Sequence, residues 1–251
     1  MHRWTIQGVA ALMAGLAAAQ SATPAMEAQG KEGRIRVQLA ARNEVEVSSE
    51  IAAKIAQLDL REGDPFHAGQ TLVAFDCSLY AAQLHKAEAT LDAAKQLSSV
   101  NQRLSELHSV GALEVQQAEA KVKEGSAEVA YMRSTVGKCA IAAPFSGRVS
   151  KRYASAQQYA TPGKPILQIL DTGNLEVQMI VPSKWLTWLK PGAHFQVQVD
   201  ELGRQYPAKV TRLGARIDPV SQSLPVTAEI DTKAPELLPG MSGFAVFANQ
   251  P

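Results

Sequence analysis

The chain has 251 residues, 46% of them hydrophobic and 20% charged, which is ordinary globular usage and argues against wholesale disorder or a collagen-like fold. Among the first 19 residues, Arg3 is the one formally charged side chain when histidine is counted as neutral. Without these 19 residues the chain has 24 basic and 24 acidic residues, so no global attraction to nucleic acid or anionic lipid is expected. Two cysteines exclude a disulfide-dense scaffold and a four-cysteine zinc site.

Residues 1–19 have the composition of a secretory signal peptide. A weakly basic start precedes an apolar run of mostly small residues from Ile6 to Ala19, and three alanines at its end supply a cleavage site. The run is shorter than the roughly 20 residues that a membrane-spanning helix needs, which makes an uncleaved anchor the weaker interpretation. Cleavage after Ala25 or Ala28 also fits the sequence. Residues 20–43 are then expected to form a leader and a first strand.

Residues 77–138 are expected to form an antiparallel α-helical hairpin. No proline occurs between Phe66 and Ala143, and the second half of this stretch has a strict 3-4 apolar spacing that keeps one helix face toward a partner helix. In the first half the apolar spacing slips by three residues near Leu97, which predicts a stammer, and Gly111 is expected at the end of the first helix. A compact bundle is the alternative, but it needs further helices. The expected seam residues of the second helix are Val115, Val122, Val129 and Val136.

The segments on the two sides of the hairpin resemble each other. A constant shift of 94 residues superimposes Gly69 on Gly163, and each copy is expected to contain a strand, a polar turn, a glycine turn and a second strand. Two short β units cannot each bury a core, but they can do so when they pack face to face. Residues 44–76 and 139–172 are therefore expected to form one small β-sandwich, into which the hairpin is inserted.

Residues 173–251 are expected to form a small antiparallel β-barrel. Five or six short segments alternate between apolar and polar residues and are separated by proline and glycine turns. A short helix from Ser183 to Leu189, with Ser183 as its N-cap, is expected between two strands. Trp185 and Trp188 lie on this helix. One is expected to pack on the barrel, and the other, if exposed, would contact a partner protein or a membrane.

Three motifs, in this order and with the helical insert, resemble those of HlyD-type periplasmic adaptor proteins, also called membrane fusion proteins. Gly69–Leu72 is similar to the first lipoyl half-motif of that family, Ile141–Val149 to the second, and Leu237–Gly243 to the closing turn of its barrel. The resemblance covers residues from about 44 to 248. It implies an elongated α+β fold, with a lipoyl-like β-sandwich split by an antiparallel α-helical hairpin and followed by the barrel. The usual membrane-proximal domain is expected to be missing or vestigial.

The resemblance implies a non-catalytic function, without a metal or cofactor, in a tripartite efflux pump. The protein would lie in the periplasm of a Gram-negative bacterium and link an inner-membrane efflux transporter to an outer-membrane TolC-type channel, assembled as a trimer or hexamer. A proton-driven resistance-nodulation-division transporter is the expected partner, with an ATP-driven one as the alternative. A secreted coiled-hairpin interaction or adhesion protein is a second interpretation. A true biotinyl or lipoyl carrier is disfavoured because about 60 helical residues replace the hairpin that would carry its acceptor lysine.

The turn between the helices holds the candidate partner-binding residues. Adaptors of pumps often carry Arg-x-x-x-Leu-x-x-x-x-x-x-Ser here, where the hairpin meets the channel. Arg103 and Leu107 match this pattern, and Glu114 takes the place of the serine. Arg103 is suited to charge-assisted bonds and Leu107 to apolar contact, while Glu114 can pair with Arg103 or cap the second helix. An ordinary solvated turn is the alternative.

Cys77 and Cys139 flank the hairpin. Antiparallel helices bring their bases together, which places these cysteines within disulfide range, and an exported protein reaches an oxidising compartment. Two buried free thiols are the alternative. The five histidines show no metal-ligand spacing, so no metal site is expected.

Overall fold

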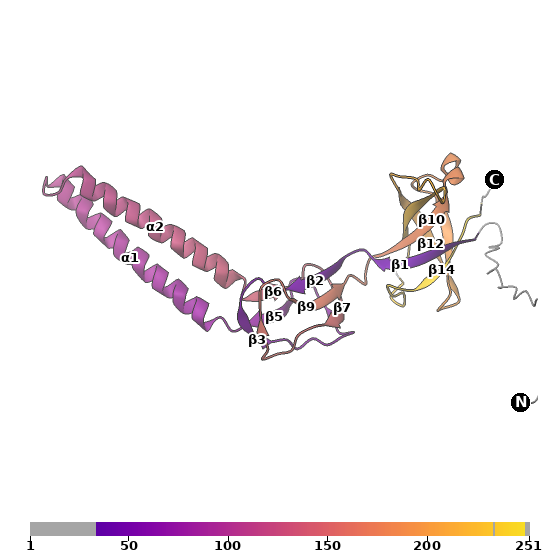
Figure 1. The fold of residues 1–251 in the computed structure, drawn as a ribbon, viewed down its shortest axis with the longest axis horizontal. Coiled ribbons are helices and arrows are strands. Elements are labelled where there is room, and N and C mark those ends of the chain that lie inside the picture. The colour runs from indigo at the N-terminus through magenta and orange to yellow at the C-terminus, as the bar shows by residue number, and fades with distance from the viewer. Residues whose placement is uncertain (1–33, 233, 249–251) are drawn as a thin grey trace, which may run out of the picture. The chain divides into compact units, whose positions relative to one another are not determined.

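A computed structural model describes residues 34–232 and 234–248 of the chain (Figure 1). The predicted signal peptide, residues 1–19, and the first part of the expected leader lie outside the described residues. In the part that is described, none of the helices has the length and apolar character needed to cross a membrane.

Two four-stranded antiparallel sheets form from the segments that precede and follow the helices. Their strands are β2 (Glu44–Ser48), β3 (Ala53–Gln57), β4 (Pro65–Phe66), β5 (Thr71–Phe75), β6 (Ala140–Ala142), β7 (Gly147–Arg152), β8 (Tyr159–Ala160) and β9 (Pro165–Leu170). One sheet has the strand order β2-β9-β7-β4 and the other the order β6-β5-β3-β8. The 94-residue shift found in the sequence moves the start of β3, β4 and β5 onto the start of β7, β8 and β9. It therefore also relates one sheet to the other.

The repeat extends to single backbone hydrogen bonds. The Gly63 N–H donates to the Val149 carbonyl at 2.8 Å, and its shifted counterpart, the Gln157 N–H, donates to the Ile55 carbonyl, also at 2.8 Å. Both donors have a positive φ, 89° at Gly63 and 71° at Gln157, a region that glycine adopts without a Cβ clash and other residues rarely enter. In each half, the polar turn therefore donates a backbone hydrogen bond to a strand of the other half.

The core between these sheets contains apolar side chains from both halves. Nine of its fifteen buried residues come from the first half and six from the second, so neither half buries this core without the other. The largest buried members are Val47, Ile51, Ile55, Leu58, Phe66, Leu72, Val73, Phe75, Val149, Ile166, Leu167 and Ile169.

Two long helices, α1 (Ser78–Glu106) and α2 (Ala112–Gly137), follow β5 and pack along each other (Figure 1). Their apolar seam is formed by Ala87 and Leu91 of α1 and by Val129 of α2, with Val122 and Met132 partly buried beside them. Among the other predicted seam residues, Val115 and Val136 are also partly buried.

A close approach fixes the register of the two helices. Gly125 of α2 packs on α1 so tightly that a Cβ atom there would lie 3.2 Å from the Cα atom of Leu91. Glycine is therefore tolerated inside α2 for its small size, although it lowers helix propensity.

The stammer predicted near Leu97 is wrong. From Leu91 the residues that face α2 continue at regular heptad positions through Ala94, Ser98 and Asn101. Ser98 is only 7% exposed, whereas Leu97 is 53% exposed. The seam in this part of α1 is polar because the helices keep the register set by Leu91, and the Asn101 side-chain amide donates to the Glu114 carbonyl at 3.3 Å.

The turn between the helices also differs from the prediction. α1 ends at Glu106, His108 lies just beyond its C-cap with a φ of 54°, and the Ser109 N–H donates to the Leu104 carbonyl at 2.8 Å. This is a Schellman ending in which histidine occupies the left-handed position that glycine favours. Gly111, expected at the end of the first helix, has an extended backbone and is the N-cap of α2.

A closed six-stranded antiparallel barrel has the order β1-β10-β13-β12-β11-β14, which confirms the predicted β-barrel. Its strands are β1 (Arg34–Ala41), β10 (Leu175–Pro182), β11 (His194–Val199), β12 (Arg204–Leu213), β13 (Ser223–Ile230) and β14 (Ser242–Val246). Residues 173–251 do not close this barrel by themselves. β1 comes from the segment expected as leader and first strand, and it pairs with both β10 and β14, which would otherwise be open edges.

The short helix between β10 and β11 is a 3-10 helix, η1 (Ser183–Thr187), shorter than predicted. Ser183 is its first residue rather than its N-cap, which is Pro182, and no side chain caps it. Trp188, its C-cap, has a φ of −122° and packs on the barrel.

Candidate functional site: the two ends of the helical hairpin

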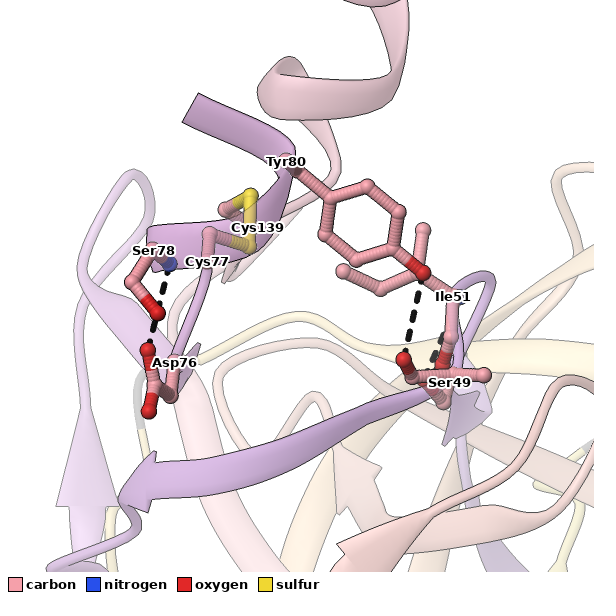
Figure 2. Close-up of a disulfide and its surroundings, with 8 residues drawn as sticks. Ser49, Ile51, Asp76, Cys77, Ser78, Tyr80 and Cys139 are labelled. Atoms are coloured by element: carbon pink, nitrogen blue, oxygen red, sulfur yellow. Dashed lines mark hydrogen bonds between the residues drawn. A yellow bond between two sulfur atoms is a disulfide. The ribbon is translucent and has the colours of Figure 1, made fainter. Parts of the chain in front are cut away.

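A disulfide joins Cys77 and Cys139 at the base of the hairpin, with their Cα atoms 6.0 Å apart (Figure 2). Cys77 directly precedes α1, and Cys139 follows α2 by two residues. Both side chains are partly buried and pack on the core between the two sheets. The bond therefore closes a loop that contains both helices and neither sheet.

Further contacts hold the hairpin base to the segment before β3. The Tyr80 hydroxyl of α1 donates to the Ala52 carbonyl at 3.1 Å, and Figure 2 shows its ring lying over the Ser49–Ile51 turn. On the α2 side, the Lys138 ammonium lies 2.9 Å from a Glu50 carboxylate oxygen. This ion pair is exposed and adds little stability, so the tyrosine and the disulfide are the stronger attachments.

Asp76 supports the start of α1. Its carboxylate accepts a hydrogen bond from the Ser78 N–H at 3.1 Å, which satisfies one of the free N–H groups of the first turn (Figure 2). This hydrogen bond from the Ser78 backbone lowers the pKa of the Asp76 carboxyl below its usual value of 3.8.

At the other end of the hairpin, the three predicted partner-binding residues are exposed. Arg103 lies in the last turn of α1, Leu107 is its C-cap and 72% exposed, and Glu114 lies in the first turn of α2. A Cβ atom on Gly111 would lie 2.9 Å from a Glu114 carboxylate oxygen, so this carboxylate folds back over the start of α2. Such a position favours an acid because the free N–H groups carry partial positive charge.

The structure does not pair Arg103 with Glu114. Across residues 34–232 and 234–248, neither an ion pair nor a side-chain hydrogen bond joins them. Within those residues the Glu114 carboxylate accepts no capping hydrogen bond at the start of α2 either, so its position in the first turn favours α2 only through the partial positive charge of the free N–H groups. The Arg103 guanidinium is left exposed to solvent, where it is accessible to a partner.

Neither Trp185, which lies in η1, nor Trp188, which directly follows it, is an exposed residue. Trp185 is buried, Trp188 is partly buried, and their ring centroids lie 5.0 Å apart. Both rings also pack edge-on against Phe247, at 5.3 Å for Trp185 and 5.5 Å for Trp188. Both rings pack against the barrel core, and a pump contact by either tryptophan stays a prediction.

Sequence reasoning missed Asp171. This residue links the two segments in which the chain passes between the sheets and the barrel. It is 3% exposed, and its carboxylate accepts hydrogen bonds from the Gly173 N–H at 3.0 Å and from the Asn43 side-chain amide at 3.1 Å. Asn174 also donates to it through its backbone N–H, at 3.2 Å. The run Asp-Thr-Gly-Asn is a turn signal in the sequence, but it does not show that the carboxylate reaches a second segment.

Residues 43–172 match the family model described as RND MFP, barrel-sandwich hybrid domain. This range includes both sheets and the hairpin, and it is more than half of the chain. RND denotes resistance-nodulation-division transporters, and MFP denotes membrane fusion protein.

Individual relatives are more distant. An uncharacterized protein of Haemophilus influenzae is 25% identical over 239 residues, which are 91% of this chain and 62% of that protein. The multidrug resistance protein MdtA of Yersinia pestis is 31% identical over 160 residues, which are 57% of this chain and 36% of MdtA. The chain thus spans less than two thirds of the length of either relative.

Solved structures share the fold. The membrane fusion protein Spr0693 from Streptococcus pneumoniae superimposes with a TM-score of 0.74 and 16% identity, over 87% of this chain and 99% of that one. At such low identity the similarity concerns the fold and not the partners.

Proposed function

The chain belongs to the family of RND membrane fusion proteins, and on this basis we propose that it is a non-catalytic periplasmic adaptor. In this proposal it links an inner-membrane efflux transporter to an outer-membrane TolC-type channel in a Gram-negative envelope. Residues 1–19 direct its export, which also accounts for a disulfide in an oxidising compartment.

The observation that carries the proposal is the insertion of a long helical hairpin between the two halves of one β unit. A true lipoyl carrier needs a tight turn with an acceptor lysine at this point, whereas here the connection contains α1 and α2. Two helices of 29 and 26 residues place the turn far from the sheets, on the order of 40 Å at 1.5 Å per residue. Such a projection suits a protein that spans the distance between two membrane proteins.

Within the proposed function the two ends of the hairpin have different tasks. The exposed Arg103 and Leu107 at the turn supply a charge-assisted donor and an apolar contact for the channel. The disulfide and Tyr80 hold the base of the hairpin to the sheets, which keeps the two helices together under load. Assembly of several copies into a trimer or hexamer completes a continuous path for the exported compound.

The proposal is tested by deletion of the gene and measurement of the accumulation of a fluorescent efflux dye. The wild-type chain should restore low accumulation, and Arg103→Glu combined with Leu107→Asp should fail to do so while retaining the same helix content. Lys123→Glu, an exposed change in the middle of α2, is the matched control and should behave as wild type. Unchanged dye accumulation after deletion, across several dyes, would contradict an efflux function.

A further inference from the structure

A cavity of about 880 Å³ lies beside the two segments in which the chain passes between the sheets and the barrel. These segments, residues 42–43 and 171–174, are here called the joint. The lining of the cavity also includes the ends of β10 and β13 and part of the connection from β13 to β14. Its volume lies in the range of about 300–1,000 Å³ that is typical of pockets for small organic molecules.

Backbone hydrogen bonds hold the two segments of the joint side by side. The Arg42 N–H donates to the Asn174 carbonyl at 3.0 Å, and the Asp171 N–H donates to the Asn43 carbonyl at 2.9 Å. The Asp171 carboxylate adds the contacts described above. This part of the cavity wall is therefore formed before a ligand binds, as in most small-molecule sites.

One wall of the cavity is apolar and continues the barrel core. Leu175, Ile230 and Ala234 line the cavity, and each is partly buried and packs on that core. Leu237 is almost fully buried beneath them, whereas Leu238 is 47% exposed. A ligand with an apolar body would cover these side chains and remove apolar surface from water, which favours binding.

Two arginines, Arg42 of the joint and Arg148 of β7, line the cavity on the side of the sheets, and both are exposed. Among residues 34–232 and 234–248, neither forms an ion pair. One Arg148 nitrogen donates to the Gly63 carbonyl at 2.9 Å, which leaves its other N–H groups for a ligand. The Asp171 carboxylate is bonded to N–H groups of Asn43, Gly173 and Asn174 instead.

The carboxylates that line the cavity have basic neighbours on the barrel. They are Glu176, Glu229 and Asp231. The first lies 3.0 Å from the Arg212 guanidinium, and the last lies 3.1 Å from Nδ1 of His194. The second is directly opposite Lys209 in the pairing of β12 with β13, close enough for the two charges to interact. The positive charge that has no carboxylate partner is therefore that of Arg42 and Arg148.

We propose that this cavity binds an amphipathic organic anion, a carboxylate or sulfonate with an apolar body. The acidic head would lie at Arg42 and Arg148, because a guanidinium forms short, charge-assisted hydrogen bonds with such groups. The apolar body would lie on Leu175, Ile230 and Leu238. A small inorganic anion would leave this apolar wall uncovered, and a neutral or cationic amphiphile would leave both guanidinium groups without a counter-charge. The proposal goes beyond the adaptor function and does not depend on it.

Fluorescence titration of the purified chain with 11-(dansylamino)undecanoate, an amphipathic carboxylate, tests the ligand class. Binding should be saturable, and dodecanoate should displace the probe. Dodecyltrimethylammonium and dodecyl maltoside have the same chain length with a cationic and a neutral head. Below their micelle concentrations each should need at least about tenfold more than dodecanoate, because each lacks the charge-assisted bonds. Equal displacement by all three, or no saturable binding of the probe, would overturn the proposal.

Variants of the lining test the two parts of the site. Arg42→Ala combined with Arg148→Ala should weaken binding of the probe by at least about tenfold, because two charged donors are lost. Arg34→Ala combined with Arg216→Ala is the matched control, since it removes the same charge from exposed residues outside the cavity, and it should bind as wild type. Equal affinity of the first variant and wild type would overturn the assignment of the head group.

Blocking the cavity tests its location without a change of charge. Thr232 is exposed and lines the cavity, so Thr232→Cys labelled with a bulky maleimide should bind the probe at least about tenfold more weakly than the same protein before labelling. Thr90→Cys, exposed on α1, is the labelled control and should bind as wild type. Unchanged affinity after labelling at position 232 would show that the probe binds elsewhere. These measurements use the purified chain, so their failure leaves the adaptor function to the dye assay.

Discussion

Removal of the disulfide at the hairpin base gives the sharpest stability prediction. The variant carries Cys77→Ser and Cys139→Ser, which keeps the size of the side chains and prevents the bond. Because the two cysteines are separated by 62 positions, the chain-entropy model assigns the bond about 4 kcal/mol of stabilisation. This is large for the hairpin, whose buried apolar residues are Ala87, Leu91, Ala118 and Val129.

Urea unfolding followed by helix circular dichroism measures the effect. The double variant should unfold at a lower urea concentration than wild type, and wild type in dithiothreitol should fall to the same value. The barrel tryptophans provide an internal control, because their fluorescence transition should not depend on the bond. Identical helix transitions with and without dithiothreitol, or two reactive thiols in the folded wild-type protein, would refute the reasoning.

Four further changes test single contacts. Gly125→Leu should lower the free energy of unfolding by about 1–3 kcal/mol through overpacking on α1, whereas the exposed control Ala130→Leu should change it by less than about 0.5 kcal/mol in urea titrations. His108→Gly should stabilise the hairpin by up to about 1 kcal/mol, since it relieves a positive φ, and a lower thermal midpoint would contradict this. Asp171→Ala should cost about 2–4 kcal/mol, because buried N–H groups lose a charged acceptor, and an unchanged urea midpoint would contradict it. The folded-state pKa of Asp76 is lowered, so the stabilisation by its carboxylate is present above about pH 4 and is lost as the pH falls through that folded-state pKa. Asp76→Asn should remove this part of the acid sensitivity. An acid-unfolding curve of unchanged steepness would contradict this expectation.

The features that followed from the sequence are those that depend on local patterns. The barrel strands alternate clearly, the proline-free stretch holds both long helices, and the motifs on either side of it identified the family. The 94-residue repeat was also visible in the sequence, because both halves need a tight turn with positive φ at the same place.

The features that sequence reasoning missed depend on contacts between distant segments. The apolar spacing near Leu97 suggested a slip, but the register fixed by Leu91 and Gly125 prevails and leaves Leu97 exposed. β1 looked like part of a leader because its pairing with β10 and β14 has no local signal. The same applies to Asp171, whose hydrogen bond to Asn43 joins residues 128 positions apart.

The most direct test of the adaptor function is co-purification of the tagged chain from cross-linked envelopes of its own bacterium. The account predicts that an inner-membrane efflux transporter and an outer-membrane channel are both recovered. It also predicts that Arg103→Glu combined with Leu107→Asp loses the channel and keeps the transporter. Recovery of neither membrane protein with the wild-type chain, at a level where it restores dye efflux, would contradict the claim that it links the two.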